Sequence, residues 1–256
     1  MPPTNSAARL RAEVIAVRPK RTRYDQPMAG GTGKRGPRGD ISVETILLAA
    51  EELLASQGPR ALTQRRIAKQ AGVSPTALYT YAADLESIRI ALGDRFLGAI
   101  DTELLLIDDP ETALATFLQH VQKLFTDNPG HAQLLAQQRI AGPNALKLNE
   151  TLLTFFQVTV GHSAEAAAGI TGMLTEWVYG HALIAADNGV TPGFARALGR
   201  QEMSQYPLTA AMIGQASPGL DFRAGDEIAR TLMVRALTSP PTGGRGRAQQ
   251  PPAREL

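Results

Sequence analysis

The chemically most informative stretch of this chain spans positions 63–81 and reads TQRRIAKQAGVSPTALYTY. A small residue, Ala68, is followed four positions later by Gly72, which suits two short helices that cross closely around a tight turn. Ser74 can cap the second helix, and Pro75 fits its first position, where no backbone N–H is needed. We therefore expect a helix-turn-helix at this point of the sequence.

The outward side of the second short helix carries groups that can contact double-stranded DNA. Methyl and hydroxyl groups of Thr76, Ala77 and Thr80 can meet thymine methyls and base edges in the major groove, and a tyrosine hydroxyl can bind a phosphate. This helix contains no Lys or Arg. Sequence-independent attraction to phosphates must therefore come from other residues.

The charge of the chain is unevenly distributed, although its formal net charge is only +2. Residues 1–40 carry nine Lys/Arg against three Asp/Glu, a net charge of +6, whereas residues 41–238 carry 14 Lys/Arg against 20 Asp/Glu, a net charge of −6. An acidic body with a basic arm indicates a polyanionic partner. The cations that we expect to meet phosphates are Lys34, Arg35, Arg38, Arg65, Arg66 and Lys69, although Arg66 and Lys69 could instead form a solvated helix face.

The composition favours an all-α fold. Apolar residues make up 43% of the chain and aromatic residues only 5%, and no segment alternates long enough to indicate a sheet. Residues 1–40 and 239–256 are rich in Pro, Gly and Arg, so we expect disordered arms there. Apolar residues at helical spacing predict helices over 41–57, 84–106, 110–126, 130–140, 144–160, 164–188, 194–213, which Pro207 could break, and 222–238.

The helix-turn-helix and its neighbours resemble the tetracycline-repressor (TetR) family of dimeric bacterial transcription regulators. The resemblance covers residues 41 to about 97 and includes the runs AAEELLASQGPRALT and RRIAKQAGVSPTALYTY, followed by a connecting helix from about Asp84. It implies a DNA-binding domain at 41–83 and a helical effector-binding and dimerisation domain at 84–238.

In that family, Gln64 and Arg65 match positions that touch DNA from the first short helix, and residues 75–81 match the recognition helix. The family often has an aromatic residue at the position of Ala82 and a lysine close to Asp84, so one phosphate contact is expected to be missing here. The candidate DNA-binding residues are Lys34, Arg35, Arg38, Gln64, Arg65, Arg66, Lys69, Ser74, Pro75, Thr76, Ala77, Tyr79, Thr80 and Tyr81.

The part of the chain after the helix-turn-helix is larger than a DNA-binding domain requires. We therefore expect it to bind a ligand or another protein chain. The resemblance implies that helices near 165–188 and 222–238 pair with those of a second copy, and a dimer would read a partly palindromic operator. The alternative is that both apolar stripes belong to the core of one chain. Residues that could line an apolar pocket for a small apolar or aromatic effector are Phe117, His120, Val121, Leu124, Phe125, Leu152, Phe155, Phe156, Trp177 and His181, with core packing as the alternative for each.

The family mechanism would be a two-state linkage, in which effector favours a dimer with wrongly spaced recognition helices and DNA weakens effector binding. Two alternatives stay open, namely an effector-independent DNA-binding dimer and an activator on the same fold. We expect ligand-dependent repression.

An enzyme is disfavoured by the motifs. GTGKRG at 31–36 satisfies G-x-G-x-x-G, but no predicted strand precedes it. The four histidines show no metal-binding spacing, and no G-x-S-x-G turn occurs. We expect neither a cofactor nor a metal ion. With no cysteine and no apolar run long enough to span a bilayer, the sequence predicts a cytoplasmic protein without a membrane partner.

Overall fold

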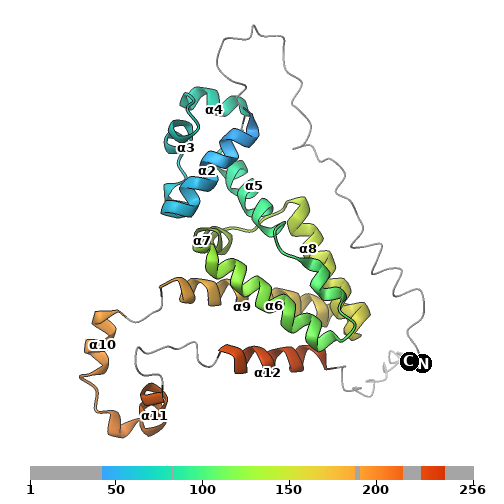
Figure 1. The fold of residues 1–256 in the computed structure, drawn as a ribbon, viewed down its shortest axis with the longest axis vertical. Coiled ribbons are helices and arrows are strands. Elements are labelled where there is room, and N and C mark those ends of the chain that lie inside the picture. The colour runs from blue at the N-terminus through green and yellow to red at the C-terminus, as the bar shows by residue number, and fades with distance from the viewer. Residues whose placement is uncertain (1–41, 82–83, 188–190, 216–225, 240–256) are drawn as a thin grey trace, which may run out of the picture.

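The computed structural model describes residues 42–81, 84–187, 191–215 and 226–239, and every regular element in these ranges is helical (Figure 1). The all-α expectation is therefore confirmed. The α-helices are α2 (Val43–Gln57), α3 (Gln64–Gln70), α4 (Pro75–Tyr81), α5 (Leu85–Leu97), α6 (Pro110–Asp127), α7 (Pro129–Gln137), α8 (Pro143–Thr154), α9 (Ala164–Asp187), α10 (Pro192–Leu198), α11 (Pro207–Gln215) and α12 (Asp226–Thr238). Three 3-10 helices, η1 (Pro59–Ala61), η2 (Thr102–Leu106) and η4 (Met203–Gln205), and one π-helix, η3 (Phe155–Val160), complete the described elements.

Side-chain caps explain where several helices begin. Ser42 caps α2 and forms a reciprocal capping box with Thr45. Asp84 caps α5, and Asp109 caps α6 directly before Pro110. Each cap satisfies a backbone N–H that has no partner inside its helix. These starts are therefore fixed by residues close in sequence.

The helix predicted over 84–106 is wrong in its second half. Helix α5 ends at Leu97, and a separate 3-10 turn, η2, follows. After Gly98, the amides of Ala99 and Ile100 donate to carbonyls three residues earlier. The amide of Asp101 donates to Nε2 of His120 on α6, at 3.1 Å, instead of to a carbonyl one turn earlier. The side chain of Asp101 then caps the new turn through the amide of Glu103.

Two other predicted helices are interrupted. The segment 194–213 is divided into α10, η4 and α11, and Pro207 begins α11 as its first residue. The segment 144–160 changes from α-helix to π-helix at Phe155 and ends at Gly161, whose φ of +91° is a left-handed conformation. Glycine adopts this conformation without steric cost, so it terminates the helix cleanly.

The buried apolar residues form two cores that meet along α5 and α7. The N-terminal core packs α2, α3 and α4 around Leu54 and Ile67, both 0% exposed. The C-terminal core packs α6, α8 and α9 around residues such as Phe156, also 0% exposed. Helix α5 contributes Ile88 and Leu92 to the first core and Phe96 and Leu97 to the second. Helix α7 likewise contributes Leu134 to the first core and Ala132 and Leu135 to the second.

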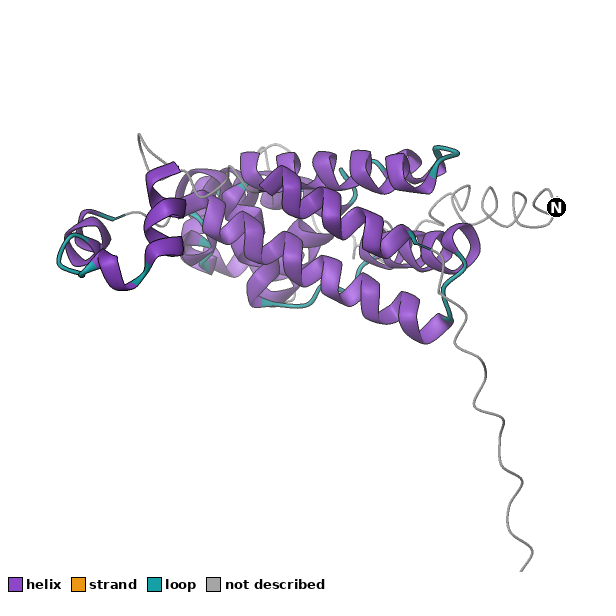
Figure 2. Ribbon diagram, turned by 90° about the horizontal axis from the view of Figure 1, so that it is seen from below, coloured by secondary structure: helices purple, strands orange, loops and turns teal. Residues whose placement is uncertain are grey.

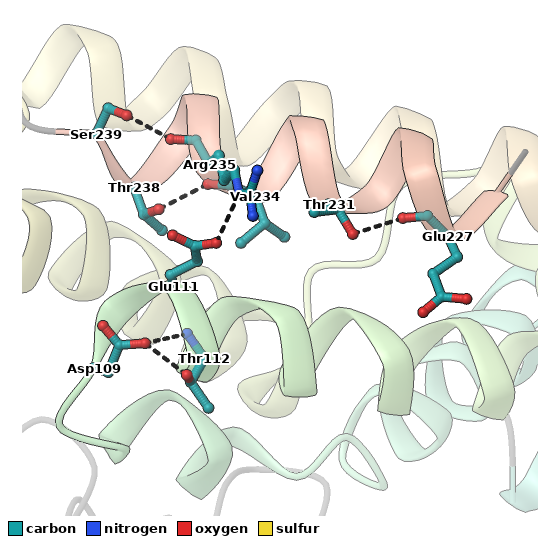
Figure 3. A network of polar contacts seen from close by, with 9 residues as sticks. All are labelled: Asp109, Glu111, Thr112, Glu227, Thr231, Val234, Arg235, Thr238 and Ser239. Atoms are coloured by element: carbon teal, nitrogen blue, oxygen red, sulfur yellow. Dashed lines mark hydrogen bonds and ion pairs between the residues drawn. The ribbon is translucent and has the colours of Figure 1, made fainter.

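Helix α12 returns from the far end of the chain and lies along α6 (Figures 1 and 3). Arg235 Nε bonds Glu111 Oε1 at 3.2 Å, and Arg230 Nη1 donates to Gln122 Oε1 at 2.9 Å. These two contacts attach the described C-terminal helix to the body. By contrast, α10, η4 and α11 project from the body in both ribbon views (Figures 1 and 2).

Candidate nucleic-acid interface

The turn between α3 and α4 has the geometry that its residues predict. Gly72 has φ +68°, and Ala68 is 1% exposed where the two helices approach each other. The amide of Val73 donates to the carbonyl of Ala68 at 2.9 Å, and Ser74 Oγ accepts from the amide of Ala77 at 3.0 Å. Leu78, 2% exposed, then packs α4 onto the N-terminal core. The helix-turn-helix expectation is confirmed.

Burial leaves one continuous polar side of this motif facing outward. On α3, Arg65 and Lys69 are exposed, while Ile67 and Ala68 point into the core. On α4 and its cap, Ser74, Pro75, Thr76 and Tyr79 are exposed and Ala77 is half-buried.

Every Lys or Arg within residues 63–81 lies on α3, namely Arg65, Arg66 and Lys69. Direct attraction of this motif to phosphates therefore comes from α3, and α4 can add only uncharged contacts.

A hydrogen bond joins the two helices on the exposed side. The hydroxyl of Tyr79 donates to Oε1 of Gln64 at 2.8 Å. This bond fixes the amide of Gln64 so that its NH₂ group remains available as a donor, while the Tyr79 oxygen can still accept. Two of the predicted DNA-binding residues are thus brought together across 15 positions of sequence.

Arg66 lies on a different side of α3 from this pair. Its Nη2 donates to Oε1 of Gln57 at the end of α2. One turn later, Gln70 Nε2 donates to Glu52 Oε2 at 2.6 Å, also on α2. These bonds hold the Arg66 side of α3 against α2, whereas within the described residues no such bond holds Arg65 or Lys69. We therefore expect Arg66 to be the weakest of the three α3 cations as a phosphate contact.

Some predicted DNA-binding residues cannot be located. Lys34, Arg35 and Arg38 lie outside the described residues. Thr80 and Tyr81 belong to the last turn of α4, but their side chains are likewise outside what the structure describes.

An acidic side chain stands where the resemblance would favour a cation. Asp84 Oδ1 accepts from both the amide and the hydroxyl of Ser87, each at 2.7 Å. These bonds, from the backbone first and the hydroxyl second, lower the pKa of Asp84. The carboxylate is therefore charged at neutral pH, and it serves the cap of α5 instead of a phosphate.

The family assignment follows from two matches that together cover most of the body. The family model described as "Bacterial regulatory proteins, tetR family" matches residues 46–92, which contain α3 and α4. The model described as "Tetracyclin repressor-like, C-terminal domain" matches residues 108–227. The chain belongs to the tetR family of bacterial regulatory proteins. Its N-terminal part matches the family's helix-turn-helix domain, and its helical C-terminal part matches the family's C-terminal domain.

Similar proteins support this membership at the level of fold. An HTH-type transcriptional regulator from Saccharopolyspora erythraea is 26% identical over 129 residues, which cover 50% of this chain and 51% of that protein. The chain thus spans about half the length of the curated relatives it matches. A possible TetR family regulator from Streptomyces coelicolor A3(2) is 22% identical, with a TM-score of 0.64 over 77% of this chain and 98% of that one. ActR from Streptomyces coelicolor, solved in complex with (S)-DNPA, is 18% identical, with a TM-score of 0.64 over 77% and 96%.

Most of the predicted effector residues lie in the C-terminal core of this tetR-family chain. Phe117, Val121, Phe125, Leu152, Phe155 and Phe156 are buried there. Leu124 and Trp177 are half-buried against the same core. The structure thus gathers these side chains in one apolar region.

The two histidines predicted as polar anchors already have partners. His120 Nε2 accepts from the amide of Asp101, so this nitrogen is unprotonated in the structure. His181 Nε2 lies 3.7 Å from Asp226 Oδ2 of α12. Both histidines therefore join helices, in keeping with the alternative of structural residues.

A half-buried tyrosine in the same region was not singled out from the sequence. Tyr179 of α9 stacks on Phe125 with ring centroids 5.6 Å apart. Burial raises the pKa of its hydroxyl, and a smaller effect of Arg139 opposes it. The signal in the sequence was a lone tyrosine in an apolar helix, two positions after Trp177.

The contacts that join the two cores were also missed. His131 of α7, 3% exposed, stacks on Phe96 of α5 with centroids 4.4 Å apart. Its Nε2 lies 2.6 Å from Glu51 Oε1 of α2, although the pair is not aligned as a regular hydrogen bond. Within the described residues, no group of three or more acidic or histidine side chains is arranged to hold a metal ion. None of the helices in those ranges is long and apolar enough to span a membrane.

Proposed function

We propose that this tetR-family regulator is a homodimeric repressor that a small apolar or aromatic effector releases from a partly palindromic DNA operator. The observation that carries the proposal is the exposed polar side of α3 and α4, where Gln64 and Tyr79 are bonded to each other and Arg65 and Lys69 remain exposed. Such a surface suits insertion into a major groove with phosphates on its rim.

Different residues supply affinity and specificity in this proposal. Arg65 and Lys69 attract phosphates, aided by Lys34, Arg35 and Arg38 of the N-terminal segment. Thr76 and Ala77 contact base edges and thymine methyls. The Gln64–Tyr79 pair positions two polar groups before DNA arrives, which reduces the entropy lost on binding.

Exposed apolar side chains on α9 and α12 support a dimer. Ile184 of α9 is 71% exposed, and Ile228 and Leu232 of α12 are 64% and 62% exposed. Ile228 and Leu232 are one turn apart, so they form a single stripe on α12. Large apolar groups in contact with water favour a protein interface, and an isologous pairing of α9 and α12 would cover them.

The C-terminal core supports the effector part of the proposal. It is rich in aromatic side chains, and the half-buried Tyr179, which packs against it, supplies a hydroxyl as a polar group. A family neighbour, ActR, was solved with a small molecule, (S)-DNPA. By analogy, we propose that the aromatic region around Phe117, Phe125 and Phe156 takes a small apolar or aromatic compound.

Selection of genomic fragments from the source bacterium with the purified full-length chain tests the proposal. We expect enrichment of one partly palindromic sequence, bound by a dimer in sedimentation experiments. The Arg65→Ala variant should bind the same fragment more weakly, and Leu146→Ala, a change at an exposed position on α8, should bind normally. Recovery of no preferred fragment would reject the DNA-binding proposal.

The same fragment separates the remaining alternatives. Transcription in vitro from the bound promoter should fall when the protein is added, and a rise would favour an activator. A screen of aromatic compounds should find one that dissociates the complex. Failure of every compound to affect either DNA binding or thermal stability would favour an effector-independent dimer.

A further inference from the structure

The first turn of α8 is capped by a residue that lies 50 positions earlier in the chain. The N-cap residue of α8, Gly142, has no side chain, and Pro143 follows it. Asp94 of α5 takes over this role, because its Oδ1 accepts from the amide of Ala145 at 2.9 Å. Its Oδ2 accepts from Nδ2 of Asn144 at 3.2 Å, and the same Nδ2 also donates to the carbonyl of Asp94 at 3.1 Å.

The surroundings of Asp94 fit this contact closely. Asp94 is only 8% exposed, although its side chain is a carboxylate. A Cβ at Gly142 would lie 2.6 Å from the Cβ of Asp94, and a Cβ at Gly98 would lie 2.9 Å from the Asn144 amide group. Two glycines thus allow α5 to approach the start of α8. A negative group at a helix N-terminus is also favoured by the helix dipole.

The neighbouring residue ties α5 to the DNA-binding side. Arg95 Nη2 bonds Glu44 Oε1 in the first turn of α2 at 2.7 Å. Ile88 and Leu92 of α5, six and two residues before Asp94, belong to the N-terminal core. Because α5 is one continuous helix, a shift of the helix-turn-helix carries Asp94 with it. At its other end, α8 leads directly into Phe155 and Phe156 of the C-terminal core.

We propose that Asp94 is the positioning residue that couples the DNA-binding face to α8, and through α8 to the proposed effector region. This inference rests on the proposed function. When DNA fixes the orientation of α5, the Asp94 carboxylate fixes the first turn of α8, and a ligand that moves α8 acts on α5 through the same contact. Linkage requires the two effects to be reciprocal, so DNA can serve as the probe without knowledge of the effector.

Hydrogen exchange with and without the selected operator tests this coupling in the full-length protein. In the wild type, we expect saturating operator to change amide exchange in peptides covering 143–152 by about five-fold or more. In Asp94→Ala, this operator-induced change should disappear, although operator still binds. Asp94→Asn keeps one acceptor for Ala145 and should retain part of the change.

Asp109→Ala is the matched control. Asp109 caps α6 through the amide of Thr112 at 2.8 Å, but this contact lies within one segment and joins no other helix. The control should therefore lose a helix cap and keep the operator-induced change in 143–152. An unaltered change in Asp94→Ala, or no change in the wild type despite operator binding, would overturn the inference. Failure of the wild type to bind any operator would instead reject the proposed function, and this inference with it.

Discussion

The helix-turn-helix and the C-terminal body hold their helices together in different ways. In the helix-turn-helix, the hydrogen bonds that shape the turn join residues close in sequence, as in the bond between Val73 and Ala68 and the cap of Ser74 on Ala77. In the body, several polar contacts between helices join distant residues, such as Asp94 with Ala145 and Arg230 with Gln122. The first arrangement favours a rigid surface on α3 and α4. The second allows the movement of one helix to displace another.

The largest expected effect separates stability from DNA binding. Phe156 is 0% exposed in the C-terminal core, so Phe156→Ala should lower the free energy of unfolding by about 3–5 kcal/mol. The operator affinity of the folded protein should change much less, because Phe156 is far from α3 and α4 in the chain and belongs to the other core. Chemical denaturation and operator titration measure the two quantities. Val158→Ala, at a position that is 39% exposed, is the control.

A substitution in the core of the helix-turn-helix should lower both the free energy of unfolding and the operator affinity. Ala68→Leu adds three carbons at the α3–α4 crossing and should cost about 1–3 kcal/mol of stability through overpacking. It should also abolish operator binding, because the second helix can no longer pack in place. The same substitution at the exposed Ala55 of α2 should be tolerated. Tight operator binding by Ala68→Leu would contradict the rigid-surface view.

Two neighbouring arginines on α3 should differ in their contribution to DNA binding. Arg65→Ala should reduce the slope of log K against log salt by about one and weaken binding about ten-fold at 0.1 M salt. Arg66→Ala should leave the slope nearly unchanged, because Arg66 is bonded to Gln57 of α2. Operator titrations at several salt concentrations measure both slopes. Equal slopes for the two variants would show that the bond between Arg66 and Gln57 does not persist in the DNA complex.

The smallest effect concerns the bond across the reading surface. Tyr79→Phe removes the hydroxyl that donates to Gln64 and should weaken operator binding by about 0.5–1.5 kcal/mol. Thermal stability should hardly change, because Tyr79 is 54% exposed. Tyr206→Phe, at a tyrosine of similar exposure outside the helix-turn-helix, is the control. Fluorescence anisotropy with labelled operator resolves a change of this size.

The sequence was sufficient for the helix-turn-helix because its signals are local. Ala68, Gly72 and Ser74 each have a conformational role that a short stretch of chain determines. The all-α class followed from composition and helical spacing for the same reason. The roles of individual residues in DNA and effector binding remain predictions.

The end of α5 and the capping of α8 could not be predicted in this way. Helix α5 ends at Leu97, shortly before Asp101. The amide of Asp101 donates to His120, which lies 19 residues further along the chain. Asp94 looks like an ordinary surface acid in an amphipathic pattern, and only the fold brings it to Ala145. A single sequence contains no periodic signal for such a pairing, since the partners lie on different helices.

The absence of cations from α4 has a consequence for the cell. A bacterial chromosome offers a vast excess of non-cognate sites, and a regulator with many basic side chains on its reading helix spends most of its time on them. In the proposed function, the absence of cations from α4 lowers that background occupancy, so that a smaller number of molecules can keep one promoter occupied.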